Sequence, residues 1–116
     1  MKDEKEFVKD QATIYKNNRQ ELVSHQKILA QYQETKNKIA IQIQGEIANE
    51  TDELGNAKFS NETKRKAEFE KRIKDNQRYN QYADMVRAEL EEIEEIKAAI
   101  DITTMNVRVW DIVTRM

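Results

Sequence analysis

Two long, proline-free stretches with a seven-residue repeat constrain the fold of this chain more than any other feature. In the first stretch, one heptad position holds Val8, Tyr15, Leu22, Leu29, Lys36 and Ile43, and another holds Gln11, Asn18, His25, Tyr32 and Ile39. In the second, one position holds Tyr79, Val86, Ile93, Ile100 and Val107, and the alternate position holds Ala83, Leu90, Lys97 and Thr104. This spacing turns one stripe of a helix toward a partner helix. We therefore predict an all-α fold, an antiparallel helical hairpin that forms a coiled coil.

The segment between the two stretches supplies a turn and a helix start. Gly55 and Asn56 tolerate the positive φ that ends a helix, and either Ser60 or Asn61 could cap a new one. We expect a long helix at about residues 4–51, a turn at 52–60, a short basic helix at about 61–74 and a long helix at about 78–114, all in a single domain. Residues 39–43 (IAIQI) alternate as a strand would, but isoleucines four residues apart at 39, 43 and 47 favour a helix.

Composition and the N-terminal sequence exclude several classes of protein. The 116 residues are 36% charged and include no cysteine, so neither a disulfide framework nor a thiolate zinc site is expected. The N-terminal MKDEKEF is charged from its second residue, unlike a secretory signal. No apolar run approaches the roughly 18 residues that a membrane span needs. We expect a soluble, cytoplasmic protein that has no membrane partner.

The sequence offers little for catalysis. His25 is the only histidine, and Glu21 lies four residues before it, but a metal site would need further ligands. We expect His25 to be a polar layer of the helical seam. The acidic run at 89–95 spreads around its helix rather than forming a cation site. No phosphate-binding loop or nucleophile motif is visible. We predict a protein that is not an enzyme and that uses no cofactor or metal.

The N-terminal and C-terminal regions of the chain lie at the same end of the expected hairpin. Their apolar residues form a surface there, here called the oligomer face, that is too wide for a single seam. The residues of this oligomer face are Phe7, Ile14, Met105, Val109, Trp110, Ile112 and Met116. A wide apolar face at one end of a helical protein indicates self-association or a binding surface. We expect a homo-oligomer, most simply a dimer that forms a four-helix bundle there; a thicker intramolecular seam is the alternative.

A cluster of cations, here called the basic elbow, surrounds the expected short helix. It comprises Lys58, Lys64, Arg65, Lys66, Lys71, Arg72, Lys74 and Arg78. With Tyr79 and Tyr82 as stacking groups, it could bind single-stranded nucleic acid through salt-dependent phosphate contacts. The same cations could instead hold an acidic protein or a nucleotide. Interspersed acids also allow intrahelical pairs such as Glu68 with Arg72, which would make the cluster an ordinary solvated helix face.

The segment at 48–73, ANETDELGNAKFSNETKRKAEFEKRI, resembles a pattern in small coiled-coil proteins of bacteriophages and prophages of Gram-positive bacteria. The matching residues are Asp52, Glu53, Gly55, Lys58, Phe59, Ser60, Asn61, Glu62, Arg65 and Glu68. Such proteins are often encoded among early or replication and recombination genes, and their functions are mostly unassigned. The resemblance therefore implies a phage-type origin, and with it a location in the cytoplasm of the host cell. We therefore expect a phage accessory protein that binds a host or phage protein or single-stranded nucleic acid. The alternatives are an anti-defence protein, which would inhibit a host immune protein such as a CRISPR effector or sequester a signalling nucleotide, and a structural coiled-coil adaptor.

Overall fold

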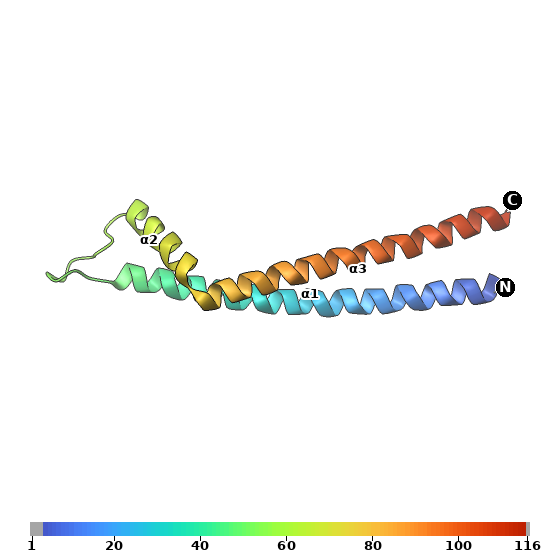
Figure 1. The fold of residues 1–116 in the computed structure, drawn as a ribbon, viewed down its shortest axis with the longest axis horizontal. Coiled ribbons are helices and arrows are strands. Elements are labelled where there is room, and N and C mark those ends of the chain that lie inside the picture. The colour runs from blue at the N-terminus through green and yellow to red at the C-terminus, as the bar shows by residue number, and fades with distance from the viewer. Residues whose placement is uncertain (1–3, 116) are drawn as a thin grey trace. The chain divides into compact units, whose positions relative to one another are not determined.

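The computed structural model describes residues 4–115 and consists of three helices (Figure 1). Helix α1 spans Glu4–Asn49, α2 spans Glu62–Asp75 and α3 spans Gln77–Arg115. Over the described residues there is no β-strand, only an isolated antiparallel bridge between Thr51 and Ala57. The predicted all-α class is confirmed. Within the same residues, no helix is both long enough and apolar enough to cross a lipid bilayer.

Residues 39–43, which alternate like a strand, lie within α1. Ile39, Ile43 and Ile47 are buried, and Ile47 is only 2% exposed, whereas Ile41 is 65% exposed. A four-residue spacing keeps the first three side chains on one helix face, and Ile41 falls on the opposite face. Helical periodicity thus overrides the β-propensity of the isoleucines at this site.

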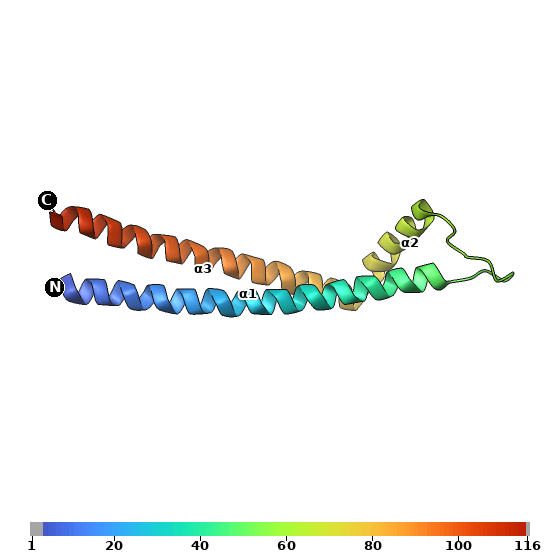
Figure 2. The same ribbon diagram turned by 180° about the vertical axis from the view of Figure 1, so that it is seen from behind.

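The chain divides into two compact units, and both long helices contribute to each. Unit 1 comprises Met1–Leu29 and Ala88–Met116, and unit 2 comprises Ala30–Arg87. In unit 1, the first part of α1 and the last part of α3 lie side by side and run in opposite directions, as the front and back views agree (Figure 1, Figure 2). Its core is small: Leu22, Ile93 and Ile96 are buried, and Leu29 and Ile100 pack against them.

The seam of unit 1 differs from the predicted register in α3. Leu90 is 46% exposed, and Lys97 and Thr104 are exposed, so the prediction that they occupy the alternate heptad position is wrong. Ile96 and Thr103 are buried instead, one residue earlier in each heptad. A helix can continue a stripe three or four residues after Ile93. Isoleucine at the third residue buries far more apolar area than lysine at the fourth, and this difference sets the register.

Unit 2 has a broader core because three segments contribute to it. Ile39, Ile43 and Ile47 of α1 are covered by Phe59 of the loop and by residues of the other two helices. These further covering residues are Phe69, Ile73, Tyr79 and Tyr82. Val86 is also buried in this unit. The loop, α2 and the first part of α3 thus cover this side of α1 together.

Truncating a buried and an exposed isoleucine of α1 should separate burial from helix propensity. Ile47→Ala should lower the free energy of unfolding by about 2–5 kcal/mol, because it removes buried methyl groups and leaves a cavity. Ile41→Ala, six residues earlier, should change it by no more than about 0.5 kcal/mol. Urea denaturation followed by far-UV circular dichroism measures both. Equal losses in the two variants would contradict the burial pattern described here.

Candidate binding surfaces

The loop before α2 is built by a local network around Asp52. Its Oδ1 atom accepts hydrogen bonds from the backbone N–H groups of Leu54 (2.9 Å) and Asn56 (3.0 Å). Gly55 has a φ of 81°, a conformation that glycine adopts without strain. The backbone N–H of Lys58 then donates to the carbonyl of Glu50 (2.9 Å). These bonds place Phe59 over the end of α1.

Asparagine side chains start both helices that follow the loop. Oδ1 of Asn61 accepts from the N–H of Lys64 at 2.8 Å, so Asn61 rather than Ser60 caps α2. Asn76 accepts from the N–H of Tyr79 at 2.7 Å and so serves α3 in the same way. Nδ2 of Asn80 donates back to carbonyls at the end of α2, including that of Lys74 (3.0 Å). The junction of α2 and α3 is therefore fixed by hydrogen bonds.

Four of the eight cations of the basic elbow contact other groups of unit 2, and two of them, Arg72 and Lys58, form ion pairs. Arg72 forms ion pairs with Glu50 and with Glu68, the latter at 2.8 Å, and its guanidinium lies 5.7 Å from the centroid of the Phe59 ring. Lys58 pairs with Glu50 at 3.3 Å and lies 5.6 Å from the same ring. The hydrogen bond from Arg72 holds the pKa of Glu50 below its usual value, and the bond from Lys58 adds to this effect. Arg72 and Lys58 therefore clamp the loop onto α1 and α2.

Two further cations of the elbow contact neighbouring groups. Nη1 of Arg65 lies 3.4 Å from the carbonyl oxygen of Phe59, to which it donates. Arg78 lies over the Tyr82 ring, 6.0 Å from its centroid. Tyr82 also meets Tyr32 edge to face at 6.1 Å, and Tyr79 packs against the isoleucine cluster. The two tyrosines are therefore partly buried, and the prediction that they serve as stacking groups for bases is not supported by their packing.

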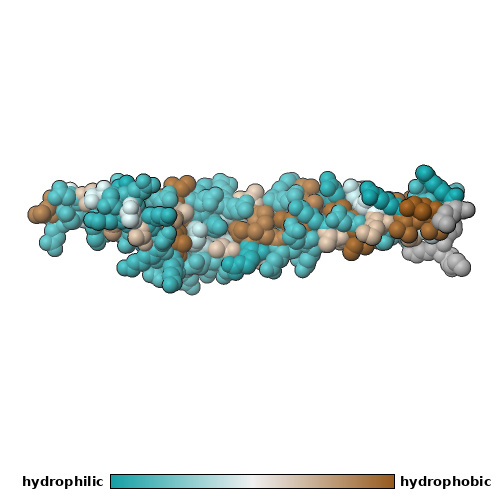
Figure 3. Space-filling view, turned by 90° about the horizontal axis from the view of Figure 1, so that it is seen from above, coloured by the Kyte–Doolittle hydropathy of each residue, from teal (hydrophilic) through white to brown (hydrophobic). Residues whose placement is uncertain are grey.

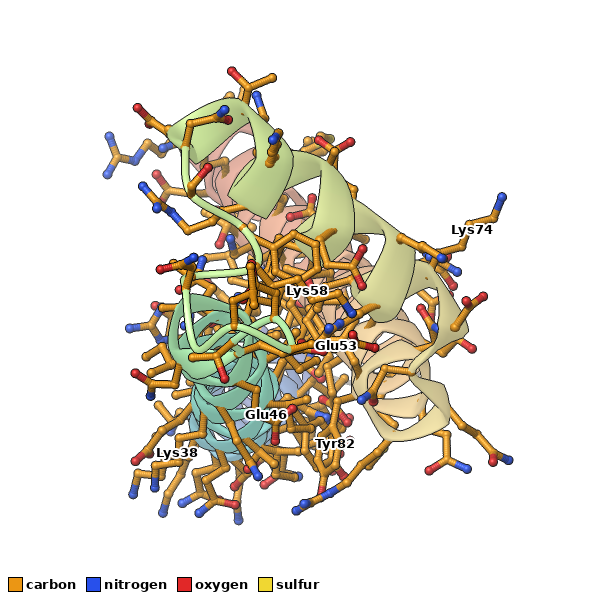
Figure 4. The ribbon with its side chains drawn as sticks, turned by 90° about the vertical axis from the view of Figure 1, so that its left-hand side faces the viewer. Lys38, Glu46, Glu53, Lys58, Lys74 and Tyr82 are labelled. Carbon is orange, nitrogen blue, oxygen red and sulfur yellow. The ribbon has the colours of Figure 1, made fainter. Side chains whose placement is uncertain are left out.

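The remaining elbow cations are solvated. Lys64, Lys66, Lys71 and Lys74 are exposed, and within residues 4–115 none of them forms an ion pair within 4.0 Å. Figure 4 shows Lys74 extending away from the helices, whereas Lys58 lies among the side chains beside the loop. Lys66 also lines a shallow groove of about 390 Å³ together with Arg65. The rest of its lining is Gln44, Ile47, Ala48, Glu62 and Phe69.

The predicted oligomer face separates into a packed pair and a free surface. Phe7 and Trp110 stack on each other, with ring centroids 4.5 Å apart, and both are partly buried within unit 1. Ile14, Met105, Val109 and Ile112 are exposed. Met116 lies outside the described residues. Sequence reasoning missed Ile102, which is 57% exposed and lies three residues before Met105, at the same helical spacing.

Five exposed apolar residues in the second half of α3 share one face of the helix and form a stripe, here called the outer stripe. Its members are Ala98, Ile102, Met105, Val109 and Ile112. Their spacing alternates between four and three residues, the pattern of a coiled-coil seam. Each member of the outer stripe lies two residues after a residue on the face that α3 turns toward α1. Two residues correspond to about 200° around the helix, so the outer stripe lies on the opposite face. Figure 3 views the molecule from the side on which α3 lies in Figure 1, and it shows apolar surface in brown over this helix.

A histidine–carboxylate pair crosses the seam of unit 1. Nδ1 of His25 lies 2.7 Å from Oε2 of Glu89, and both side chains are partly buried. This hydrogen bond raises the pKa of His25 above its usual value; desolvation opposes the shift, and the charges of Glu89, Glu92 and Glu21 add to it. Within residues 4–115, no group of three or more metal-ligating side chains converges. The pair is thus a polar layer between two helices.

The His25–Glu89 pair should make stability depend on pH in a defined direction. Because the folded-state pKa of His25 is raised, its stabilising effect is complete below the unfolded value near 6.5 and is lost as pH rises through the folded value. The free energy of unfolding should therefore be higher at pH 6 than at pH 8. In Glu89→Gln this difference should shrink, as urea denaturation at both pH values would measure. A wild-type difference that persists in the variant would assign it to other groups.

No protein-family model, curated protein or solved structure matches the chain. The two surfaces described above are therefore interpreted from their own chemistry. They are the outer stripe of α3 in unit 1 and the exposed lysines of α2 in unit 2.

Proposed function

We propose that this chain is a non-enzymatic binding protein that self-associates through the outer stripe of α3. In this proposal the two long helices form an antiparallel hairpin with coiled-coil packing, and two hairpins pack through their α3 helices, so that each α3 lies between its own α1 and α3 of the other copy. The observation that carries the proposal is that unit 1 has a small buried core but a large exposed apolar surface on α3. Its core consists of three buried aliphatic side chains, whereas Met105 and Ile112 are each 60% exposed and Val109 is 54% exposed.

The cost of leaving these side chains in water supports an apolar partner. Burial of apolar surface contributes about 25 cal/mol per Å², so a continuous stripe of aliphatic residues gains by pairing with a second helix. A thin two-helix core is marginal by itself, and oligomerisation is a common way to enlarge such a core. Isolated apolar residues on a surface are ordinary, but a stripe with heptad spacing over two turns or more is typical of a helix interface.

We propose phage DNA replication or recombination as the setting, supported by the resemblance of residues 48–73 to phage proteins. In the proposed assembly, unit 2 would contact a protein or single-stranded nucleic acid. Two other settings use the same surfaces. One is an anti-defence protein that inhibits a host immune protein or sequesters a signalling nucleotide, and the other is a structural coiled-coil adaptor.

A charge placed in the outer stripe should break the oligomer. Val109→Glu should raise the dissociation constant of the dimer by about a hundredfold or more, because an unpaired carboxylate would be buried in each copy. Sedimentation equilibrium over a range of concentrations measures this shift. Ile41→Glu is the matched control. Like Val109→Glu, it replaces an exposed β-branched aliphatic residue by glutamate, but it lies in unit 2. A wild-type chain that stays monomeric at high micromolar concentration would refute the self-association.

A second candidate function, nucleic-acid binding, is favoured by the four unpaired lysines of α2. Changing Lys64, Lys66, Lys71 and Lys74 together to Gln should weaken binding to a fluorescent single-stranded oligonucleotide. The slope of log affinity against log salt should also fall by about 0.7 for each phosphate that the variant no longer neutralises. Fluorescence anisotropy in a salt series tests this. The matched control changes Lys5, Lys9, Lys16 and Lys27 of α1 to Gln, which removes the same charge from unit 1. Equal effects of the two quadruple variants would exclude a specific site on α2.

A further inference from the structure

We propose that the outer stripe pairs with the outer stripe of a second copy of this chain in antiparallel orientation, in one register fixed by charge. This inference rests on the proposed self-association and specifies its geometry. It places Ile102 of one copy against Met105 of the other, and Ala98 against Val109. The two-fold axis then passes between positions 103 and 104 of the paired helices.

The charges beside the outer stripe favour one orientation of the paired helices. One flank of the stripe holds Glu94 and Asp101 in its first half and Arg108 and Arg115 in its second half. The other flank holds the uncharged residues Ala99, Asn106 and Val113. Interhelical ion pairs at such flanking positions set the partner and the orientation of paired helices. Because this flank is acidic in its first half and basic in its second, opposite charges of two copies meet only when the paired helices run in opposite directions.

The antiparallel register satisfies all four flanking charges. Asp101 of each copy meets Arg108 of the other, and Glu94 meets Arg115. Asp101 and Arg108 form no ion pair within 4.0 Å among the described residues, so both are free to engage a partner. Arg115 pairs with Asp111 at 3.2 Å and Glu94 with Lys97 at 3.8 Å, and all four side chains are largely exposed. Exchange of these solvated pairs for intermolecular ones therefore costs little.

The competing arrangements lose these pairs. In a parallel pair, flanking residues meet positions five residues further along the partner, so Asp101 would face Asn106 and Arg108 would face Val113. Sliding the antiparallel helices by one heptad would bring Arg108 against Arg108 of the other copy. Like charges placed opposite each other disfavour the wrong arrangement. The proposed register alone combines aliphatic layers with opposite charges on the flank.

Cysteine cross-linking tests orientation and register directly, because the chain contains no cysteine of its own. Ala98→Cys and Val109→Cys proteins are purified separately, mixed and treated with a short bis-maleimide cross-linker. The proposal expects a covalent dimer in the mixture and little in either variant alone. In the antiparallel register, identical positions 98 lie eleven residues apart along the axis, about 16 Å at 1.5 Å per residue.

The outcomes separate this inference from the self-association on which it rests. Strong cross-linking of each variant alone would show parallel pairing and overturn the inference. A dimer in sedimentation that yields no cross-link in any sample would overturn this register and leave self-association standing. Monomers throughout would overturn both. Circular dichroism of each cysteine variant confirms that it is folded, and both substitutions lie at exposed positions.

A charge reversal supplies an independent readout of the same contact. Asp101→Arg alone and Arg108→Asp alone should each raise the dimer dissociation constant by about tenfold or more, because each puts like charges opposite each other in both halves of the dimer. The double variant, Asp101→Arg with Arg108→Asp, should restore it to near the wild-type value. Failure of the double variant to recover, with both single variants weakened, would show that these residues do not face each other.

Discussion

In unit 1, α1 covers one face of α3, while α3 carries apolar residues on two opposite faces. The covered face contributes Ile93, Ile96 and Ile100 to a small core with Leu22 and Leu29. The other face exposes the outer stripe to water. Two paired helices can bury only one stripe from each, so a third or fourth helix is needed to cover the remainder. The proposed self-association would cover this second face.

Unit 2 meets the same constraint within the chain. The loop and α2 cover the isoleucine cluster of α1, and aromatic side chains from both fill the space above it. Glu50 then anchors the arrangement by accepting from Arg72 and Lys58, which also flank the Phe59 ring. Arg72 and Lys58 complete this clamp, whereas Lys64, Lys66, Lys71 and Lys74 are exposed and form no ion pair among the described residues. Any ligand of α2 would therefore meet Lys64, Lys66, Lys71 and Lys74 rather than the whole elbow.

Two polar residues of the seam are satisfied in different ways, one within its own helix and one across the seam. Thr103 is buried, and its hydroxyl donates to the carbonyl of Ala99 at 3.0 Å, so it needs no partner from α1. His25 instead requires Glu89 across the seam. A cross-seam polar pair stabilises one alignment of the two helices over slipped alternatives, a role that polar core residues have in coiled coils. It does so at the expense of apolar burial.

The helical class could be predicted from the amino-acid sequence, because heptad spacing, the absence of proline and the glycine at position 55 each act locally. The sequence also indicated the start of α2, although it left Ser60 and Asn61 as alternatives for the cap. It did not determine the seam of α3, since Ile96 and Lys97 both continue a stripe from Ile93 and only the face presented by α1 selects between them. Likewise, the division of the elbow into clamping and free cations depends on where Glu50 and Phe59 lie once the loop has folded back. Those choices rest on contacts between residues distant in sequence, which periodicity does not encode.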